Sequence, residues 1–157
     1  MTHQRHFSSM RALKLWLVTV VIVLAVSAAS DSSPSRFKAD HERQVRDFMA
    51  AFTDRNLDSM LSMADENIQW LSIDGTKITV VTEGKAALRK SMESYFRKCP
   101  SCRSSLEWIR SAGNRVTALE RASWTGKNGP VTQKSLSVYE FNAAGIVRVF
   151  YFPAERE

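Results

Sequence analysis

The sequence predicts an α+β domain in which a curved, mostly antiparallel sheet wraps over three helices from the N-terminal half of the chain. Two observations carry this prediction. Before residue 100, apolar residues recur at helical spacing in three segments, whereas later residues alternate between apolar and polar in runs separated by short turns. The 157 residues are 44% hydrophobic and 24% charged, which is typical of one globular domain.

The N-terminal segment has the composition of a secretory signal peptide. Three cations, Arg5, Arg11 and Lys14, precede an apolar run from Leu15 to Val26, and small residues follow it. A membrane-spanning helix needs roughly 20 apolar residues, and this run is clearly shorter, so cleavage is favoured over a retained anchor. We expect residues 1–28 to be removed and the protein to be exported, periplasmic or secreted. It would then meet a membrane only during export.

The net charge gives no indication of a nucleic-acid partner. Removal of the signal peptide takes away its three cations and no acidic residue, so the formal charge falls from +6 to +3. The remaining Lys and Arg are scattered among Asp and Glu, whereas binding to phosphates needs clustered cations. We therefore expect no nucleic-acid binding.

The first helix is expected to follow a linker. Residues 29–39 are rich in Ser and lack periodicity, as in flexible linkers. The folded domain is therefore assigned to residues 40–157, with Asp40 as the N-cap of the helix. The apolar face of this helix consists of Val45, Phe48, Met49 and Phe52.

Two further helices are expected. A short one follows the break at Asp54-Arg55-Asn56, and another opens after Gly84 and stops at Pro100, since proline disrupts a helix interior. The apolar residues of the short helix are Leu57, Met60, Leu61 and Ala64, and those of the longer helix are Leu88, Met92, Tyr95 and Phe96.

Six strands account for most of the remaining chain. They form three pairs, and the two strands of each pair are connected by turn residues at Asp74-Gly75, Gly113-Asn114 or Gly145. The expected strands are residues 68–73, 78–82, 104–111, 115–125, 131–141 and 146–152.

Several short motifs occur between and within these elements. They are Met63-Ala64-Asp65-Glu66-Asn67-Ile68-Gln69-Trp70, Thr82-Glu83-Gly84-Lys85-Ala86-Ala87-Leu88, Tyr95-Phe96, Gly113-Asn114-Arg115-Val116, Tyr139-Glu140-Phe141, Gly145-Ile146 and Tyr151-Phe152-Pro153. Their order and spacing resemble the nuclear transport factor 2-like superfamily, in its SnoaL-like branch, over roughly residues 40–155. The resemblance implies a cystatin-like cone, a pocket between sheet and helices and, in many members, a homodimer through the outer face of the sheet. Isomerases, cyclases, dehydratases, binding modules and dimerisation platforms share this scaffold, so the resemblance implies no single activity.

Ketosteroid isomerase, an enzyme of this superfamily, allows a residue-by-residue comparison. The resemblance places its oxyanion-hole Tyr at or beside Phe48, its general-base Asp at Trp70 or Leu71, and its second oxyanion acid near Ser137. None of these side chains can perform the corresponding step. We therefore expect no steroid isomerisation by that mechanism.

Glu120 is the main candidate for a catalytic role. By the period of a strand, it shares one face with the mostly apolar set Val116, Ala118, Ala122 and Trp124. Arg110 on the preceding strand lies within reach if that strand keeps the same alternation. Glu120 is then either a general acid/base or polar anchor whose pKa is raised by burial, or half of a structural ion pair, and both remain open.

Aromatic side chains supply a candidate pocket. Ligand cavities are mostly apolar and aromatic with few polar groups, although aromatic residues also fill the core of a domain of this size. The expected pocket residues are Phe48, Trp70, Trp108, Glu120, Trp124 and Tyr139, with Tyr151 as a further candidate.

Cys99 and Cys102 form a C-x-x-C motif, and export favours their oxidation. A redox site is one interpretation. The motif follows a helix, however, and the negative end of the helix dipole disfavours a thiolate there. We therefore favour a structural disulfide at the turn between helix and strand.

Other catalytic and cofactor sites find little support in the sequence. The exported chain keeps one His, His41, which is expected to be solvated at the start of the first helix. With a single His a zinc site built from His and Cys is not expected, and no phosphate-binding glycine loop or nucleophile elbow occurs. We expect no metal and no cofactor.

Three functions remain open at this point. The leading hypothesis is a non-catalytic module that binds a small apolar or aromatic molecule. The alternatives are an enzyme, resembling an isomerase, cyclase or lyase, that uses Glu120 as general acid/base, and a non-catalytic dimerisation module.

Overall fold

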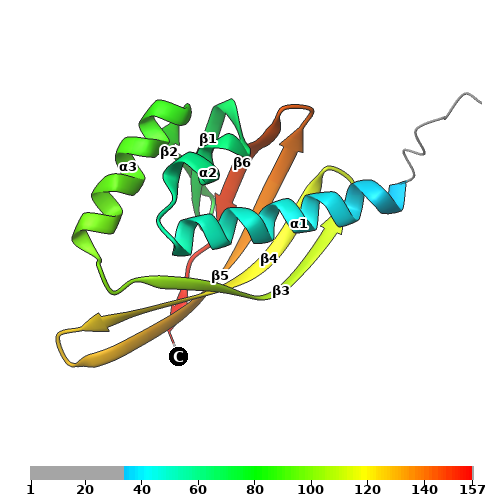
Figure 1. Cartoon of the computed structure of the whole chain (residues 1–157). Helices are drawn as coiled ribbons and strands as arrows, with labels where there is room; N and C mark the ends of the chain where they lie inside the picture. Colours follow the sequence, from blue (N-terminus) through cyan, green and yellow to red (C-terminus); the bar gives the residue numbers. More distant parts are fainter. Residues whose placement is uncertain (1–33, 157) are drawn as a thin grey trace, which may run out of the picture. The chain divides into compact units, whose positions relative to one another are not determined.

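The computed structural model describes residues 34–156, which form three helices and seven strands (Figure 1). The expected signal peptide, residues 1–28, lies outside the described residues. The helices are α1 (Pro34–Thr53), α2 (Leu57–Ser62) and α3 (Lys85–Lys98). The strands are β1 (Ala64–Asp74), β2 (Lys77–Glu83), β3 (Arg103–Ala112), β4 (Arg115–Gly126), β5 (Gly129–Asn142), β6 (Gly145–Tyr151) and β7 (Glu155–Arg156).

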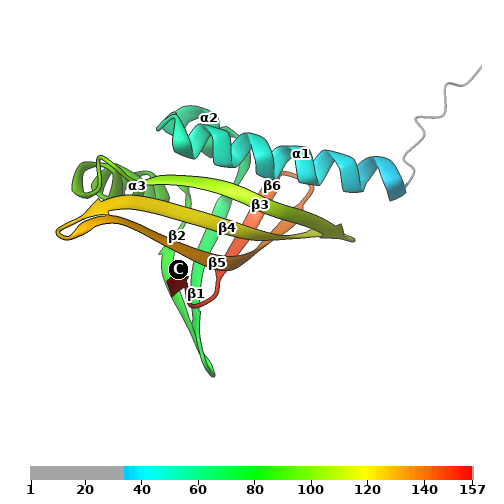
Figure 2. The same ribbon diagram turned by 90° about the horizontal axis from the view of Figure 1, so that it is seen from below.

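The strands form one sheet in the order β2-β1-β6-β5-β4-β3, with the short β7 paired to β5. Neighbouring strands are antiparallel except β1 and β6, which run parallel. The long strands β3, β4 and β5 bend as they pass α1 (Figure 2). α1 packs on β3 and β4, while α3 packs on β1 and β2. The predicted α+β class and curved, mostly antiparallel sheet are confirmed.

α1 begins earlier than the sequence suggested. Residues 29–39 were expected to be a flexible linker, but the chain is helical from Pro34 onward. Proline suits the first turn of a helix because its fixed φ matches the helix and its missing N–H needs no partner there. The expected apolar face of the helix is correct, since Val45, Phe48 and Met49 are buried.

The junction between α2 and β1 also differs from the expectation. Ala64 begins β1 instead of closing the second helix, which ends at Ser62. β6 starts beside this junction, where Ile146 N donates a hydrogen bond to Met63 O at 3.0 Å. Gly145 has φ 134°, and a Cβ at that position would lie 2.4 Å from the same carbonyl oxygen. The close approach of β6 to the start of β1 therefore requires glycine.

The hydrophobic core lies between the helices and one face of the sheet. Every helix and most strands contribute side chains to it. The face of the sheet that points toward the helices is therefore its inner face. Its fully buried apolar side chains include Val45, Phe48, Met60, Ile68, Leu88, Ile109, Val116, Tyr139, Ile146 and Val149.

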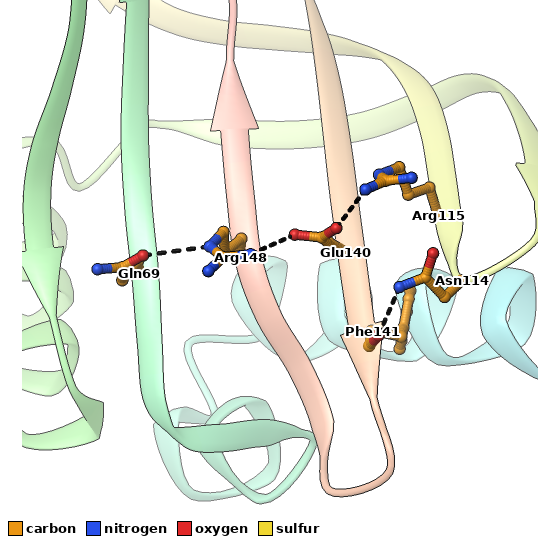
Figure 3. Close-up of polar contacts among 6 residues, drawn as sticks. All are labelled: Gln69, Asn114, Arg115, Glu140, Phe141 and Arg148. Atoms are coloured by element: carbon orange, nitrogen blue, oxygen red, sulfur yellow. Dashed lines mark hydrogen bonds and ion pairs between the residues drawn. The ribbon is translucent and has the colours of Figure 1, made fainter.

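A row of polar side chains crosses the opposite, outer face, with α1 behind the strands in the view of Figure 3. Arg115 donates to Glu140 at 2.6 Å, and Arg148 donates to both Glu140 at 2.8 Å and Gln69 at 3.2 Å. Gln69 in turn donates to Glu83 at 3.1 Å. The hydrogen bond from Arg148, supported by the charge of Arg115, lowers the pKa of the Glu140 carboxyl. We call these five residues the outer polar row.

The predicted disulfide is present. Cys99 is the C-cap of α3, and a disulfide joins it to Cys102 immediately before β3. The backbone N–H of Cys102 also donates to Cys99 O at 3.2 Å, which tightens the same turn. Within residues 34–156, no helix is long and apolar enough to span a membrane.

Candidate functional site

A cavity of about 400 Å³ lies between the helices and the inner face of the sheet. This volume falls within the range of small-molecule sites in proteins. Side chains from α1, α3 and the strands form its walls, and most of them are apolar or aromatic. The lining includes Phe48, Met49, Phe52, Trp70, Thr82, Met92, Tyr95, Ser104, Glu120, Ala122, Gln133, Ser135 and Tyr151.

Glu120 lies in the wall of this cavity with 6% of its surface exposed. It is the sole charged side chain among the described lining residues. The alternation of β4 explains its direction, because Val116 and Ala118 on the same face are also buried. The prediction that Glu120 faces inward is confirmed.

Three hydroxyl groups hold the Glu120 carboxylate. Ser137 and Tyr139 of β5 donate to Oε1 at 2.5 and 2.6 Å, and Tyr151 of β6 donates to Oε2 at 2.7 Å. Ser137 and Tyr139 are two residues apart on one strand, so both point inward. The carboxylate therefore has hydrogen bonds on both oxygens without contacting a cation. We call Glu120, Ser137, Tyr139 and Tyr151 the Glu120 cluster.

Burial dominates the ionisation of this cluster. Desolvation raises the pKa of Glu120, while the hydrogen bonds from Ser137, Tyr139 and Tyr151 act in the opposite direction. The pKa values of both tyrosines are raised well above normal, first by burial and then by the charge of Glu120. The tyrosines are accordingly neutral hydrogen-bond donors at physiological pH.

Aromatic rings border the cluster. Trp70 of β1 stacks on Tyr151, with ring centroids 5.0 Å apart and an interplanar angle of 17°. Phe48 of α1 lies 6.4 Å from Trp70 and 6.0 Å from Tyr139, measured between centroids. The polar cluster thus opens onto a largely apolar space.

Thr82 of β2 adds an unusual polar group to this wall. Its Oγ1 is buried and has no hydrogen-bond partner. The residue lines the cavity. A buried hydroxyl without a partner is costly, so a bound molecule could supply the missing hydrogen bond.

Three of the expected pocket residues, Trp108, Trp124 and Tyr139, are not part of the cavity lining. Trp108 does not line the cavity and is 41% exposed. The pairing of β3 with β4 shifts between Leu106, which faces Glu120, and Trp108, which faces Leu119. This bulge at Glu107 reverses the alternation and turns Trp108 to the outer face.

The bulge also explains the wrong prediction for Arg110. It pairs with Thr117 and donates to Ile109 O, and it forms no ion pair with Glu120. Trp124 is half-buried on β4 but is not part of the cavity lining. Tyr139 contacts Glu120 from behind the wall, fully buried in the core.

The partners of Glu120 were not predicted. The sequence indicates Ser137 only as a replacement for an acid of ketosteroid isomerase, and Tyr151 only as an aromatic pocket residue. The alternation of β5 places Ser137 and Tyr139 on the inner face together, and it could have indicated them. Their distance to Glu120 depends on strand register, which the sequence does not give.

Two observations on the described residues concern metal ligands and His41. Within residues 34–156, no group of three His, Cys, Asp or Glu side chains is arranged to hold a metal ion. His41 is half-buried and stacks on Phe141 at a centroid distance of 4.2 Å, so the expectation of a solvated His41 was wrong. Its position at the first helix still separates it from the cavity lining.

Comparisons with known proteins agree on the fold. The family model of the SnoaL-like domain matches residues 45–149. An uncharacterised cystatin-fold protein from Novosphingobium aromaticivorans is 17% identical, with a TM-score of 0.63 over 72% of this chain and 97% of that one. The protein Bal32a from a soil-derived mobile gene cassette is 18% identical, with a TM-score of 0.64 over 73% and 89%.

An LEH-like epoxide hydrolase from M. tuberculosis is 14% identical, with a TM-score of 0.57 over 73% of this chain and 83% of that one. At these identities the likeness establishes the fold alone. No curated protein matches the sequence.

Proposed function

The chain belongs to the SnoaL-like domain family, and from this premise we propose that its domain binds a small, largely apolar or aromatic molecule in the cavity beside Glu120. The observation that carries the proposal is the composition of the cavity wall. Mostly aromatic and aliphatic side chains surround about 400 Å³ of space, and Glu120 and Tyr151 of the Glu120 cluster lie in this wall. Such a wall binds an apolar body and orients it through a few polar contacts.

A cavity-filling variant tests this proposal. Ala122→Phe adds a ring to the cavity wall, whereas Ala50→Phe adds the same ring to an exposed position on α1. A panel of small aromatic and alicyclic compounds is screened by thermal shift against the wild type and both variants. A ligand present at 100 times its Kd stabilises the native state by about 2.7 kcal/mol. We expect stabilisation in the wild type and Ala50→Phe and its loss in Ala122→Phe; equal stabilisation in all three contradicts a site in this cavity.

A second candidate, an acid/base enzyme, is favoured by the buried state of Glu120. A carboxyl whose pKa is raised by burial accepts or donates protons nearer neutral pH. Relatives of the same fold include a putative hydroxylase from Streptomyces galilaeus and the epoxide hydrolase. Glu120→Gln is expected to abolish turnover of any uncharged ligand found by the screen while retaining its binding. Unchanged turnover excludes Glu120 as the acid/base.

We also propose a homodimer through the outer face of the sheet. Trp108 pairs with Leu119 and Leu119 with Leu136, so these apolar side chains share that face. Trp108 is 41% exposed. Exposed apolar patches of this kind favour association. Sedimentation equilibrium is expected to give the mass of a dimer for the wild type and of a monomer for Trp108→Glu; a monomeric wild type contradicts this proposal.

A further inference from the structure

We infer that the cavity selects an organic cation, namely an amine whose ammonium group lies against Glu120 and whose aromatic or alicyclic body fills the apolar space. This inference rests on the proposed binding function and specifies the chemical class of the ligand. It follows from three properties of the wall: its charge, the direction of its hydrogen bonds and the nature of its rings.

The first property is an unneutralised carboxylate. Glu120 is 6% exposed, and within the described part of the chain no Lys, Arg or His forms an ion pair with it. By contrast, Glu140 on the outer face contacts Arg115 and Arg148. A buried carboxylate is stable when hydrogen bonds and a counter-charge compensate for lost solvation. The cluster provides the hydrogen bonds, and a cationic ligand would provide the charge.

The second property is the direction of the hydrogen bonds. Each hydroxyl of Ser137, Tyr139 and Tyr151 has one proton, and the short contacts direct these protons to Glu120. The alternative contacts of the Tyr139 hydroxyl, with Met49 Sδ and with the Tyr151 hydroxyl, are longer, both at 3.4 Å. Tyr151 lines the cavity and therefore offers a ligand only its lone pairs, and Glu120 Oε2 can accept a second hydrogen bond. A ligand group at this part of the wall must therefore be a hydrogen-bond donor.

An ammonium group meets this requirement because it has three donors and no acceptor. The unpartnered Oγ1 of Thr82 supplies a further acceptor at the same cavity. A ligand carboxylate or phosphate would bring acceptors and a like charge toward Glu120. A neutral alcohol could donate one hydrogen bond but would leave the negative charge uncompensated.

The third property is the aromatic character of the wall beside the carboxylate. Tyr151 donates a hydrogen bond to Glu120, and Trp70 stacks on Tyr151 with ring centroids 5.0 Å apart. Phe48 lies 6.4 Å from Trp70. The faces of such rings attract cations, with Trp the strongest, and this attraction grows as water is excluded. Rings and carboxylate therefore favour the same kind of ligand.

A head-group series tests the inference. Single-ring and two-ring hydrocarbon bodies are each prepared as the ethylamine, the ethanol and the propionate analogue, and their affinities are measured by calorimetry at pH 7.5. We expect the amine to bind at least about tenfold more tightly than the alcohol with the same body. Glu120→Gln should reduce this preference to near one. Glu93→Gln, which removes an exposed carboxylate on α3, should retain it.

The outcomes separate this inference from the proposed function. Equal binding of amine and alcohol, or a preference for the carboxylate, overturns the cation inference while leaving a ligand-binding cavity. Binding of no member of the series contradicts both. A preference for amines that persists in Glu120→Gln excludes Glu120 as its source and overturns the inference.

A pH series on the wild type provides a second test if Glu120→Gln does not fold. Amine affinity should fall as the pH is lowered and Glu120 takes up a proton, whereas alcohol affinity should stay constant. The other titratable groups at this site are Tyr95, Tyr139 and Tyr151, whose pKa values are raised, so they remain neutral in this range. A constant amine-to-alcohol ratio from pH 4 to pH 8 contradicts the inference.

Discussion

The hydroxyl oxygen of Ser137 lies 2.5 Å from Oε1 of Glu120, and Ser137 is fully buried. The two residues come from adjacent strands, β5 and β4. The resemblance to ketosteroid isomerase places an acid near Ser137. A carboxylate is nevertheless present at this point of the sheet because β4 supplies it.

Removal of the Ser137 hydroxyl should destabilise the protein. Ser137→Ala takes one hydrogen bond from a buried carboxylate, and the loss is expected to cost about 1–3 kcal/mol in the free energy of unfolding near pH 7. Urea unfolding measures this difference, with Ser72→Ala at an exposed position of β1 as the matched control. Equal stabilities of the two variants would show that the hydrogen bond contributes nothing.

Glu120 should make the protein less stable as the pH rises. Its folded pKa is raised above the ordinary value of 4.5, so the native state binds its proton more tightly than the unfolded state. The stability from this group is present below the unfolded pKa and is lost as the pH rises through the folded pKa. We expect the wild type to lose stability relative to Glu120→Gln from about pH 4.5 upward. Urea unfolding of both proteins between pH 4 and pH 8 checks this; a constant difference would contradict the assignment.

The contribution of Glu140 to stability should depend on pH in the opposite direction. Its pKa is lowered, chiefly by the hydrogen bond from Arg148, so its contribution is present above the unfolded pKa and lost as the pH falls through the folded pKa. Because Arg115 and Arg148 are 58% and 46% exposed, solvent screens the ion pairs. Glu140→Gln is expected to cost up to about 1 kcal/mol at neutral pH and low salt. Salt should reduce this cost, as measured by unfolding in increasing NaCl; a cost that is independent of both pH and salt would argue against a role for charge.

The disulfide between Cys99 and Cys102 should resist reaction until it is reduced. Mass spectrometry of freshly isolated protein is expected to show no alkylation before reduction and two modified cysteines afterward. Replacing both residues with Ser should cost about 2 kcal/mol, since a short closed loop restrains the unfolded chain. Rapid reduction by a mild dithiol would instead favour the redox interpretation.

If the protein is exported, its signal peptide should be cleaved from the N-terminus. The mature protein is expected to begin at Ala29 or Ser30, after removal of the leader that precedes them. N-terminal sequencing of protein from the envelope fraction and the medium checks this prediction. Recovery of the intact N-terminus would contradict cleavage.

Much of the fold could be predicted because local patterns agreed with it. The helical spacing of Val45, Phe48 and Met49 identified the buried face of α1, and turn residues such as Gly113 located the hairpins. The alternation of apolar and polar residues along β4 also placed Glu120 on the inner face of the sheet. In each case the residues that carry the signal are close in sequence.

The predictions that failed depended on distant contacts. A single extra residue at Glu107 reversed the face of Trp108, and no residue type marks that bulge. Pairing Glu120 with Arg110 assumed an unbroken alternation and was wrong for the same reason. The contact between Glu120 and Tyr151 joins residues 31 positions apart and depends on the register of three strands.

The parallel pairing of β1 with β6 affects the order in which the protein can be assembled. Trp70 and Val149 are neighbours across these strands, although the whole of α3 and the long hairpins lie between them in the sequence. A ribosome releases β1 long before β6. During synthesis the hairpin of β1 and β2 therefore lacks the strand that pairs with the other edge of β1. Closing so large a loop slows folding. The sheet therefore becomes complete only after β6 has been synthesised, and a chain truncated before residue 145 should remain unable to form the native sheet.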